Sequence, residues 1–178
     1  MSGFNPERPP FVVTAALPPD IHAWADGLRK AHFPPERNFL QAHVTLFHSL
    51  LPSLFDELQT VLPGFAAEYA APHAAITGLM NMGRGTAIAV ESQQMLSIRQ
   101  AIADRFHGTL TSQDQHKPRL HITVQNKVSP DDAKTLQREL EPQVERREFA
   151  FPALELHIYR GGPWEFVKRW AFRGKQHG

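Results

Sequence analysis

The chain contains no cysteine among its 178 residues. A thiolate nucleophile, a cysteine-ligated zinc site and a disulfide framework are therefore excluded. Long hydrophobic runs are also missing. The longest strongly apolar run, Phe11 to Leu17, is far shorter than the ~20 residues of a membrane-spanning helix, and the polar, proline-rich start of the chain has no apolar signal core. We expect a soluble, cytoplasmic protein that does not associate with a membrane.

The chain also lacks an excess of charge of either sign. The chain has 19 Lys and Arg residues, 18 Asp and Glu residues and a net charge of +1. No overall field attracts a polyanion, so we expect no extended nucleic-acid surface, and any such contact has to rest on a local basic cleft. The length and the 42% hydrophobic content fit one domain over residues 1–178, a monomer with a flexible segment at residues 1–9.

What the chain does contain is a doubled motif. His43-Val44-Thr45-Leu46 returns in the second half as His121-Ile122-Thr123-Val124. With apolar residues required at the second and fourth positions, about 0.09 such tetrads are expected by chance in this composition. A third triplet, His107-Gly108-Thr109, has a glycine of the kind that ends a helix and is set aside. The repetition indicates two halves that each contribute a histidine and a threonine.

Hydrophobic periodicity predicts an α+β protein. The same order of strand, helix, tetrad strand, helix, strand and strand fits both halves when the 86–91 strand is shared between them. Such a duplication predicts two pseudo-symmetric lobes of antiparallel-rich sheet, with helices outside and an active-site cleft between the lobes. Strands are predicted at 11–17, 41–48, 73–79, 86–91, 119–125, 149–159 and 165–172, and helices between Pro18 and Pro34, at 53–62 with a break at Pro63-Gly64, at 92–106, and from Ser129 to Val144 with a kink or end at Pro142.

The two tetrads are expected to point their polar side chains into one cleft. Side chains two apart on a strand share a face, so His43 and Thr45 face the cleft while Val44 and Leu46 enter the core. Two other interpretations remain. The histidines can be satisfied strand residues beside threonines that simply favour strands, or they can bind a metal, although zinc usually has at least three protein ligands. We expect no metal and no cofactor.

With these motifs in this order, the chain resembles the two-histidine (2H) phosphoesterase superfamily, in the branch of 2'-5' RNA ligases and RNA 2',3'-cyclic phosphodiesterases. The resemblance extends from Phe11 to Phe172. It implies that the catalytic residues are His43, Thr45, His121 and Thr123, and that the substrate is a small nucleotide or an RNA 3' end.

Two imidazoles in one cleft suit the chemistry that the resemblance implies. Because imidazole titrates near pH ~6.5, one ring can be neutral and the other protonated. One histidine then takes a proton from water and the other protonates the departing ribose oxygen, while threonine hydroxyls donate hydrogen bonds to the phosphate. This gives a metal-independent cyclic phosphodiesterase, with either histidine as the acid. The alternatives are a 2'-5' RNA ligase or 2'-5' phosphodiesterase, and a nucleotide-binding or RNA-binding module without turnover.

Three further residues are candidates for substrate binding. Arg119, which alternation places with Gln125 on the face of His121, either pairs with a phosphate or is a solvated strand-end charge. Phe47 either stacks a base or belongs to the core. Tyr159 beside the last predicted turn forms a base platform, or packs on the surface, together with Trp164. No ligand role is expected for His73, His116, His157 or Lys127.

Overall fold

The computed structural model, which describes residues 8–175, is an α+β protein in which strands outnumber helices. Residues 1–7 of the predicted flexible segment lie outside the described residues. The strands are β1 (Phe11–Ala15), β2 (Val44–Leu50), β3 (His73–Asn81), β4 (Thr86–Glu91), β5 (His121–Gln125), β6 (Arg147–Ala150), β7 (Ala153–Tyr159) and β8 (Trp164–Ala171), and the helices are α1 (Pro19–His32), α2 (Phe55–Glu68), α3 (Gln93–Arg105) and α4 (Pro130–Leu140).

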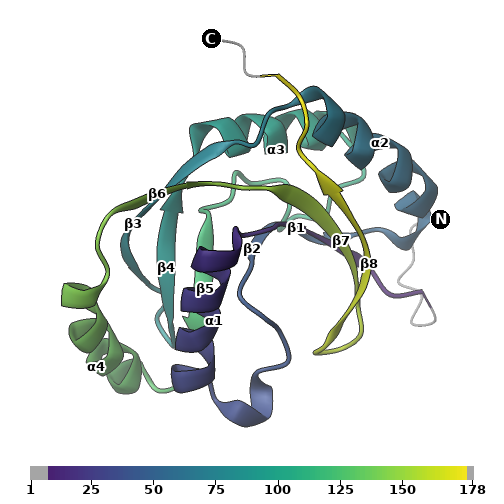
Figure 1. Ribbon diagram of the computed structural model, residues 1–178. Helices are drawn as coiled ribbons and strands as arrows, with labels where there is room; N and C mark the ends of the chain where they lie inside the picture. Colours follow the sequence, from purple (N-terminus) through teal and green to yellow (C-terminus); the bar gives the residue numbers. More distant parts are fainter. Residues whose placement is uncertain (1–7, 176–178) are drawn as a thin grey trace.

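The strands form two antiparallel sheets with corresponding orders. One sheet runs β2-β1-β7-β8 and the other β5-β4-β3-β6. In each, the strand with a tetrad lies at the edge, next to the strand that precedes it by one helix. Figure 1 shows the two sheets side by side, with α2 and α3 above them and α1 in front of β5, which it contacts. The predicted α+β class with two antiparallel sheets is confirmed, and each sheet takes strands from both halves of the chain.

The predicted strand 149–159 is wrong, because the chain changes sheets within it. β6 pairs with β3, whereas β7 pairs with β1 and β8. Pro152 separates them, and proline cannot donate a hydrogen bond to a continuing ladder. Phe151 is fully buried between the two strands. The segment that connects β6 of one sheet to β7 of the other is therefore held in the core by Phe151.

The predicted break at Pro63-Gly64 is also wrong, since α2 continues through it to Glu68. Leu58 and Leu62 on one side of the proline and Ala66 beyond it are all buried. Burial of one continuous apolar face offsets the hydrogen bond that the proline cannot make. The other helix boundaries agree with their signals: the Ser129 side chain caps α4, which ends before Pro142.

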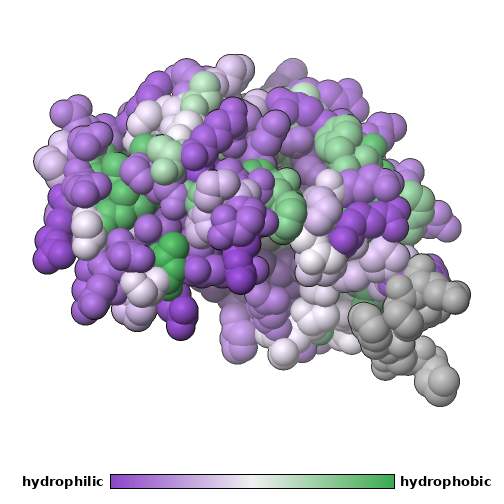
Figure 2. Space-filling view, turned by 90° about the horizontal axis from the view of Figure 1, so that it is seen from below, coloured by the Kyte–Doolittle hydropathy of each residue, from purple (hydrophilic) through white to green (hydrophobic). Residues whose placement is uncertain are grey.

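The outer surface is largely hydrophilic where it is seen from below. In Figure 2, hydrophobic residues on this face form small separate patches among hydrophilic ones. Within residues 8–175, every helix is too short or too polar to cross a membrane.

Candidate active site

Both tetrads lie on edge strands that contact one another across the gap between the sheets. His43 immediately precedes β2, and His121 is the first residue of β5. All four tetrad histidines and threonines are half-buried. The apolar tetrad residues are fully buried, as alternation along a strand predicted: Val44, Leu46, Ile122 and Val124.

The two histidines make the same hydrogen bond. Nδ1 of His43 lies 2.6 Å from the carbonyl oxygen of Gln41, and Nδ1 of His121 lies 2.6 Å from that of Arg119. A carbonyl oxygen can only accept, so each Nδ1 carries the hydrogen and donates it. This leaves Nε2 of each ring for proton transfer with a substrate.

The pKa of His43 is lowered to about 4. Burial is the largest cause, because it removes water from the imidazolium. The electrostatic effects of the neighbouring Arg29, His157 and His121 also disfavour the positive charge of the His43 imidazolium. The carbonyl of Gln41 acts in the opposite direction. His43 is therefore neutral at neutral pH in the free protein, with an unprotonated Nε2.

Neither tetrad threonine is held by a strong hydrogen bond. The hydroxyl of Thr123 donates to Sδ of Met82 at 3.7 Å, and sulfur is a weak acceptor. The side chain of Thr45 makes no hydrogen bond to another described residue, although it is half-buried. Both hydroxyls can thus donate to an anion in the cleft.

Separate cavities border the two tetrads. One of about 570 Å³ beside His43 is lined by residues of β1, β7 and β8, by the start of α1 and by the segment from Phe39 to His43. Another, of about 270 Å³, is lined by Thr45, His121 and Arg119. The exposed Arg119 also borders a larger cavity of about 830 Å³ on the other sheet. Among residues 8–175, no three histidine, aspartate or glutamate side chains come together as metal ligands.

Two residues complete the wall beside His43: Trp164, which the sequence offered as a base platform or a surface residue, and His157, for which it predicted no ligand role. The indole of Trp164 lies 4.7 Å from the His43 ring and 5.4 Å from that of His157, centroid to centroid. Nε2 of His157 is 3.2 Å from the Thr14 hydroxyl, and burial lowers the pKa of His157 to about 4. His157 is two residues before Tyr159, so both side chains lie on the same face of the strand. This was the only feature of the sequence that could have indicated a place for His157 near the site.

Of the two roles that the sequence leaves open for Phe47, the structure contradicts base stacking and supports the core. Phe47 is fully buried in the core, with the guanidinium of Arg99 4.2 Å from its ring. The reason is a bulge, because Thr14 pairs with Thr45 while Val13 pairs with Phe47. Leu46 is thus an extra residue that breaks the alternation of side chains.

Gln125 is displaced in the same way. Ala87 pairs with Thr123 but Thr86 pairs with Gln125, so Val124 is the extra residue. Gln125 is buried and accepts a hydrogen bond from Thr86 at 3.0 Å. Both tetrads therefore end in a bulge at their fourth residue, and the histidine and threonine of each are the tetrad side chains that stay half-buried.

The remaining candidates lie at the surface. Arg119 precedes β5 and its side chain is exposed. Tyr159 is 41% exposed and pairs with Trp164 across β7 and β8. It shares the strand face of His157 but does not line the cavity beside His43.

The comparisons with known proteins agree with this geometry. A family model described as the 2'-5' RNA ligase superfamily matches residues 17–163. No curated protein sequence matches the chain.

Among solved structures, the protein TT0787 of Thermus thermophilus has a TM-score of 0.66 and 14% sequence identity, covering 94% of this chain and 100% of that one. LigT of Escherichia coli complexed with NADP+ has a TM-score of 0.60 and 15% identity, covering 93% and 98%. LigT complexed with 3'-AMP has a TM-score of 0.52 and 16% identity, also covering 93% and 98%. At these identities the likeness shows the fold.

Proposed function

Because this chain belongs to the 2'-5' RNA ligase superfamily, we propose that it is a metal-independent phosphodiesterase that opens 2',3'-cyclic phosphates on RNA ends or small nucleotides. The observation that carries this proposal is the equivalence of His43 and His121. Each lies at the start of one of two edge strands that contact each other, and donates Nδ1–H to the carbonyl two residues before it. Nε2 of each ring is therefore the nitrogen left for proton transfer, and in this mechanism both Nε2 atoms act on one substrate.

His43 is the general base in this mechanism. Its pKa of about 4 keeps it neutral in the free protein. An anionic phosphate bound beside Nε2 favours the imidazolium, which raises this pKa toward the range where a base is effective. His43 then takes a proton from the attacking water as the new phosphorus–oxygen bond forms.

His121 is the general acid. Its Nε2–H donates a proton to the ribose oxygen as the bond between that oxygen and phosphorus breaks, leaving a phosphomonoester on the other ribose oxygen. Thr45 and Thr123 donate their hydroxyl hydrogens to the nonbridging oxygens, where negative charge grows. Release of the proton from His43 to solvent, and reprotonation of His121 from solvent, restore both rings.

The second candidate function is formation or cleavage of a 2'-5' phosphodiester. It is favoured by the cavity of about 830 Å³ that Arg119 and Lys117 share with the smaller cavity at His121. That cavity is large enough for a second nucleoside, and its lining shares no residue with the cavity at His43. In formation, a ribose 5' hydroxyl takes the place of water and attacks the cyclic phosphate as the bond between phosphorus and the 3' oxygen breaks; in cleavage, the 3' hydroxyl attacks and the 5' oxygen leaves with a proton.

The experiment is turnover of nucleoside 2',3'-cyclic phosphates and of linear 2'-5' dinucleotides in excess chelator. His43→Ala and His121→Ala should each lower kcat by about 10²-fold to 10⁴-fold. The matched control is His107→Ala, in the exposed triplet that lies outside the cleft, which should leave kcat unchanged.

Each other outcome is informative. Turnover that survives both tetrad substitutions contradicts the mechanism, and turnover that the chelator abolishes indicates a metal. Turnover of the dinucleotide alone selects the second candidate. Tight nucleotide binding without turnover of either substrate indicates a binding module.

A further inference from the structure

At the edges of β2 and β5 that are unpaired within the described chain, arginine side chains donate hydrogen bonds to backbone carbonyls that no neighbouring strand pairs with. The two edge strands contact each other but do not pair. A buried edge leaves backbone carbonyls without partners, and such groups are costly unless they are hydrogen-bonded. Arg99 of α3 donates to the carbonyl of Leu46 in the first tetrad, and Arg29 of α1 donates to that of Thr123 in the second.

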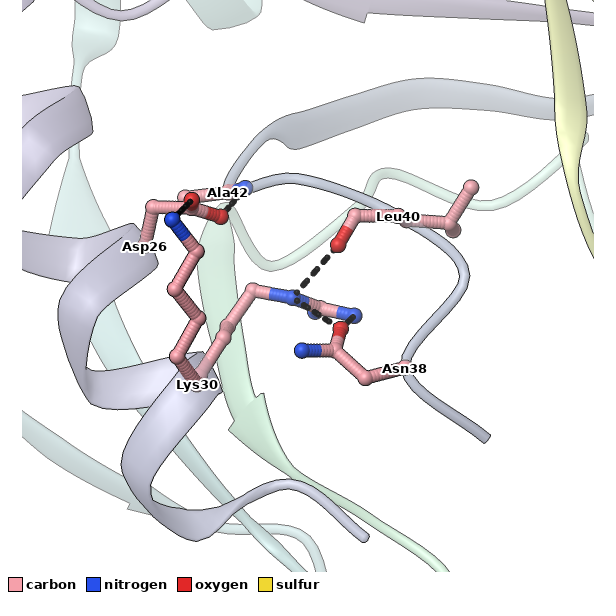
Figure 3. A network of polar contacts seen from close by, with 6 residues as sticks. Asp26, Lys30, Asn38, Leu40 and Ala42 are labelled. Atoms are coloured by element: carbon pink, nitrogen blue, oxygen red, sulfur yellow. Dashed lines mark hydrogen bonds and ion pairs between the residues drawn. The ribbon is translucent and has the colours of Figure 1, made fainter. Parts of the chain in front are cut away.

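Of the two arginines, only Arg29 makes hydrogen bonds to the segments of both tetrads within residues 8–175. Its guanidinium is buried, with Nη1 2.8 Å from the Thr123 carbonyl oxygen and Nε 3.2 Å from that of Leu40. Nη2 is 2.9 Å from Oδ1 of Asn38. Figure 3 shows Asn38 and Leu40 on the segment that leads to β2. One side chain thus joins the segment before His43 to the strand that carries Thr123.

A second contact from α1 holds the same segment. Oδ1 of Asp26, one helical turn before Arg29, accepts a hydrogen bond of 3.0 Å from the backbone N–H of Ala42. Oδ2 of Asp26 is 3.4 Å from Nζ of Lys30, as Figure 3 also shows. The residue before His43 is therefore fixed to the helix from which Arg29 extends.

Arg99 is a counterpart that reaches only one tetrad. Its Nε lies 3.1 Å from the Leu46 carbonyl oxygen and its Nη2 lies 2.6 Å from that of Asp114. The Asp114 carboxylate accepts from the N–H groups of His48 and Ser49. These contacts hold β2 after the tetrad and make no hydrogen bond to β5 among the described residues.

We propose that Arg29 is the positioning residue that sets the placement of His43 relative to His121. Proton transfer on opposite sides of one phosphorus needs both imidazoles in place, and a displacement of about 1 Å can reduce a rate by about 10²-fold. The planar fork of arginine holds three acceptors in fixed directions, which a lysine ammonium cannot do. The kinetic consequence rests on the proposed function, whereas the geometry does not.

The guanidinium has a second effect on His43. The groups that disfavour its imidazolium are Arg29 from α1, His157 from β7 and His121 from β5. Three further titratable groups line the cavity beside it: Glu155, Arg169 and His22. Arg99 is not among the charges that act on His43. Removing the charge of Arg29 should therefore raise the pKa of His43, whereas removing the charge of Arg99 should leave that pKa unchanged.

The test compares Arg29→Met and Arg29→Lys with Arg99→Met, a matched control because both arginines are almost completely buried. Thermal unfolding reports stability, NMR titration of the imidazole C–H signals reports the pKa of His43, and steady-state kinetics separates kcat from KM. Both Met variants should lower Tm. Only Arg29→Met should raise the pKa of His43, and it should lower kcat by about 10-fold to 10²-fold with a smaller change in KM.

Arg29→Lys separates charge from geometry and is the measurement to use if Arg29→Met does not fold. It should keep the low pKa of His43 but lose kcat, because the charge stays and the fork is gone. Wild-type kcat in Arg29→Lys would reduce Arg29 to a stabilising residue. The same His43 titration in Arg29→Met and Arg99→Met would contradict the effect of the Arg29 charge on His43. If wild type turns over no cyclic phosphate, the proposed function fails, and the titrations still decide the effect of Arg29 on His43.

Discussion

The indole of Trp164 lies against the imidazole of His43, with ring centroids 4.7 Å apart and ring planes tilted by 56°. Trp164 is the first residue of β8, more than a hundred residues after His43 in the chain. Its ring covers a side of the histidine that water would otherwise reach. The burial that lowers the pKa of His43 is therefore due in part to a residue from the far end of the same sheet.

Trp164→Ala should raise the pKa of His43 from about 4 toward its ordinary value of 6.5. Burial is the largest cause of the lowered pKa, and the smaller side chain admits water to the ring. NMR titration of His43 measures the shift. Tyr159→Ala is the control, because Tyr159 pairs with Trp164 across the strands but lies outside the cavity at His43. An unchanged titration in Trp164→Ala would show that other groups keep the ring dry.

Stability should fall on acidification between about pH 6.5 and about pH 4. The pKa values of His43 and His157 are both lowered from 6.5 to about 4 in the folded protein. In this range the unfolded histidines bind protons that the folded ones do not, so the free energy of unfolding decreases as pH falls. Above pH 6.5 this contribution is complete.

Urea unfolding of wild type and of the His43→Gln, His157→Gln double variant at pH 7.5 and pH 5 checks this prediction. The double variant should lose less stability between the two pH values than wild type. His116→Gln, at an exposed position, should behave as wild type. Equal losses in wild type and the double variant would assign the acid sensitivity to carboxylates elsewhere.

Thr45→Val and Thr123→Val should lower kcat by about 10²-fold to 10³-fold each, the loss typical of removing one donor to a developing negative charge. Tm should change little, because valine has nearly the shape of threonine and neither hydroxyl makes a strong hydrogen bond in the described structure. Steady-state kinetics with a nucleoside 2',3'-cyclic phosphate measures the loss. Thr109→Val, in the exposed third triplet, should keep wild-type kcat; an equal loss there would point to a general effect on folding.

Phe47→Ala should destabilise the protein by about 3–5 kcal/mol, as expected when a buried aromatic ring is removed. Phe47→Leu, which keeps most of the apolar volume, should retain the activity and base preference of wild type. The two measurements are urea unfolding and relative kcat/KM for the four cyclic nucleotides. A change in base preference in Phe47→Leu without loss of stability would restore Phe47 as a base-stacking residue.

Much of the site is local and could be predicted from the sequence. The repeated His-apolar-Thr-apolar pattern places one polar and one buried face on each strand, and this depends only on the two-residue period of a strand. The helix starts at Ser92 and Ser129 could also be predicted from the sequence, because a serine side chain accepts a hydrogen bond from the backbone N–H three residues later. The α+β class followed from these periods.

The positions that escaped prediction depend on partners far away in the chain. Whether Phe47 and Gln125 face the cleft is decided by bulges, and a bulge is a property of two strands and not of one. The helix through Pro63 persists because its apolar face is covered on both sides of the proline. In each case a long-range contact overrides the local pattern.

The sequence by itself determined which side chains can carry the chemistry: two histidines and two threonines in matching strand contexts. Only the tertiary structure decided how they are placed and tuned. Arg29 joins Leu40 to Thr123, and Trp164 and His157 enclose His43, through contacts between segments that no periodicity relates. The physical reason is that periodicity encodes the face of a single element, whereas burial, electrostatic neighbours and inter-strand distance arise only when elements pack together.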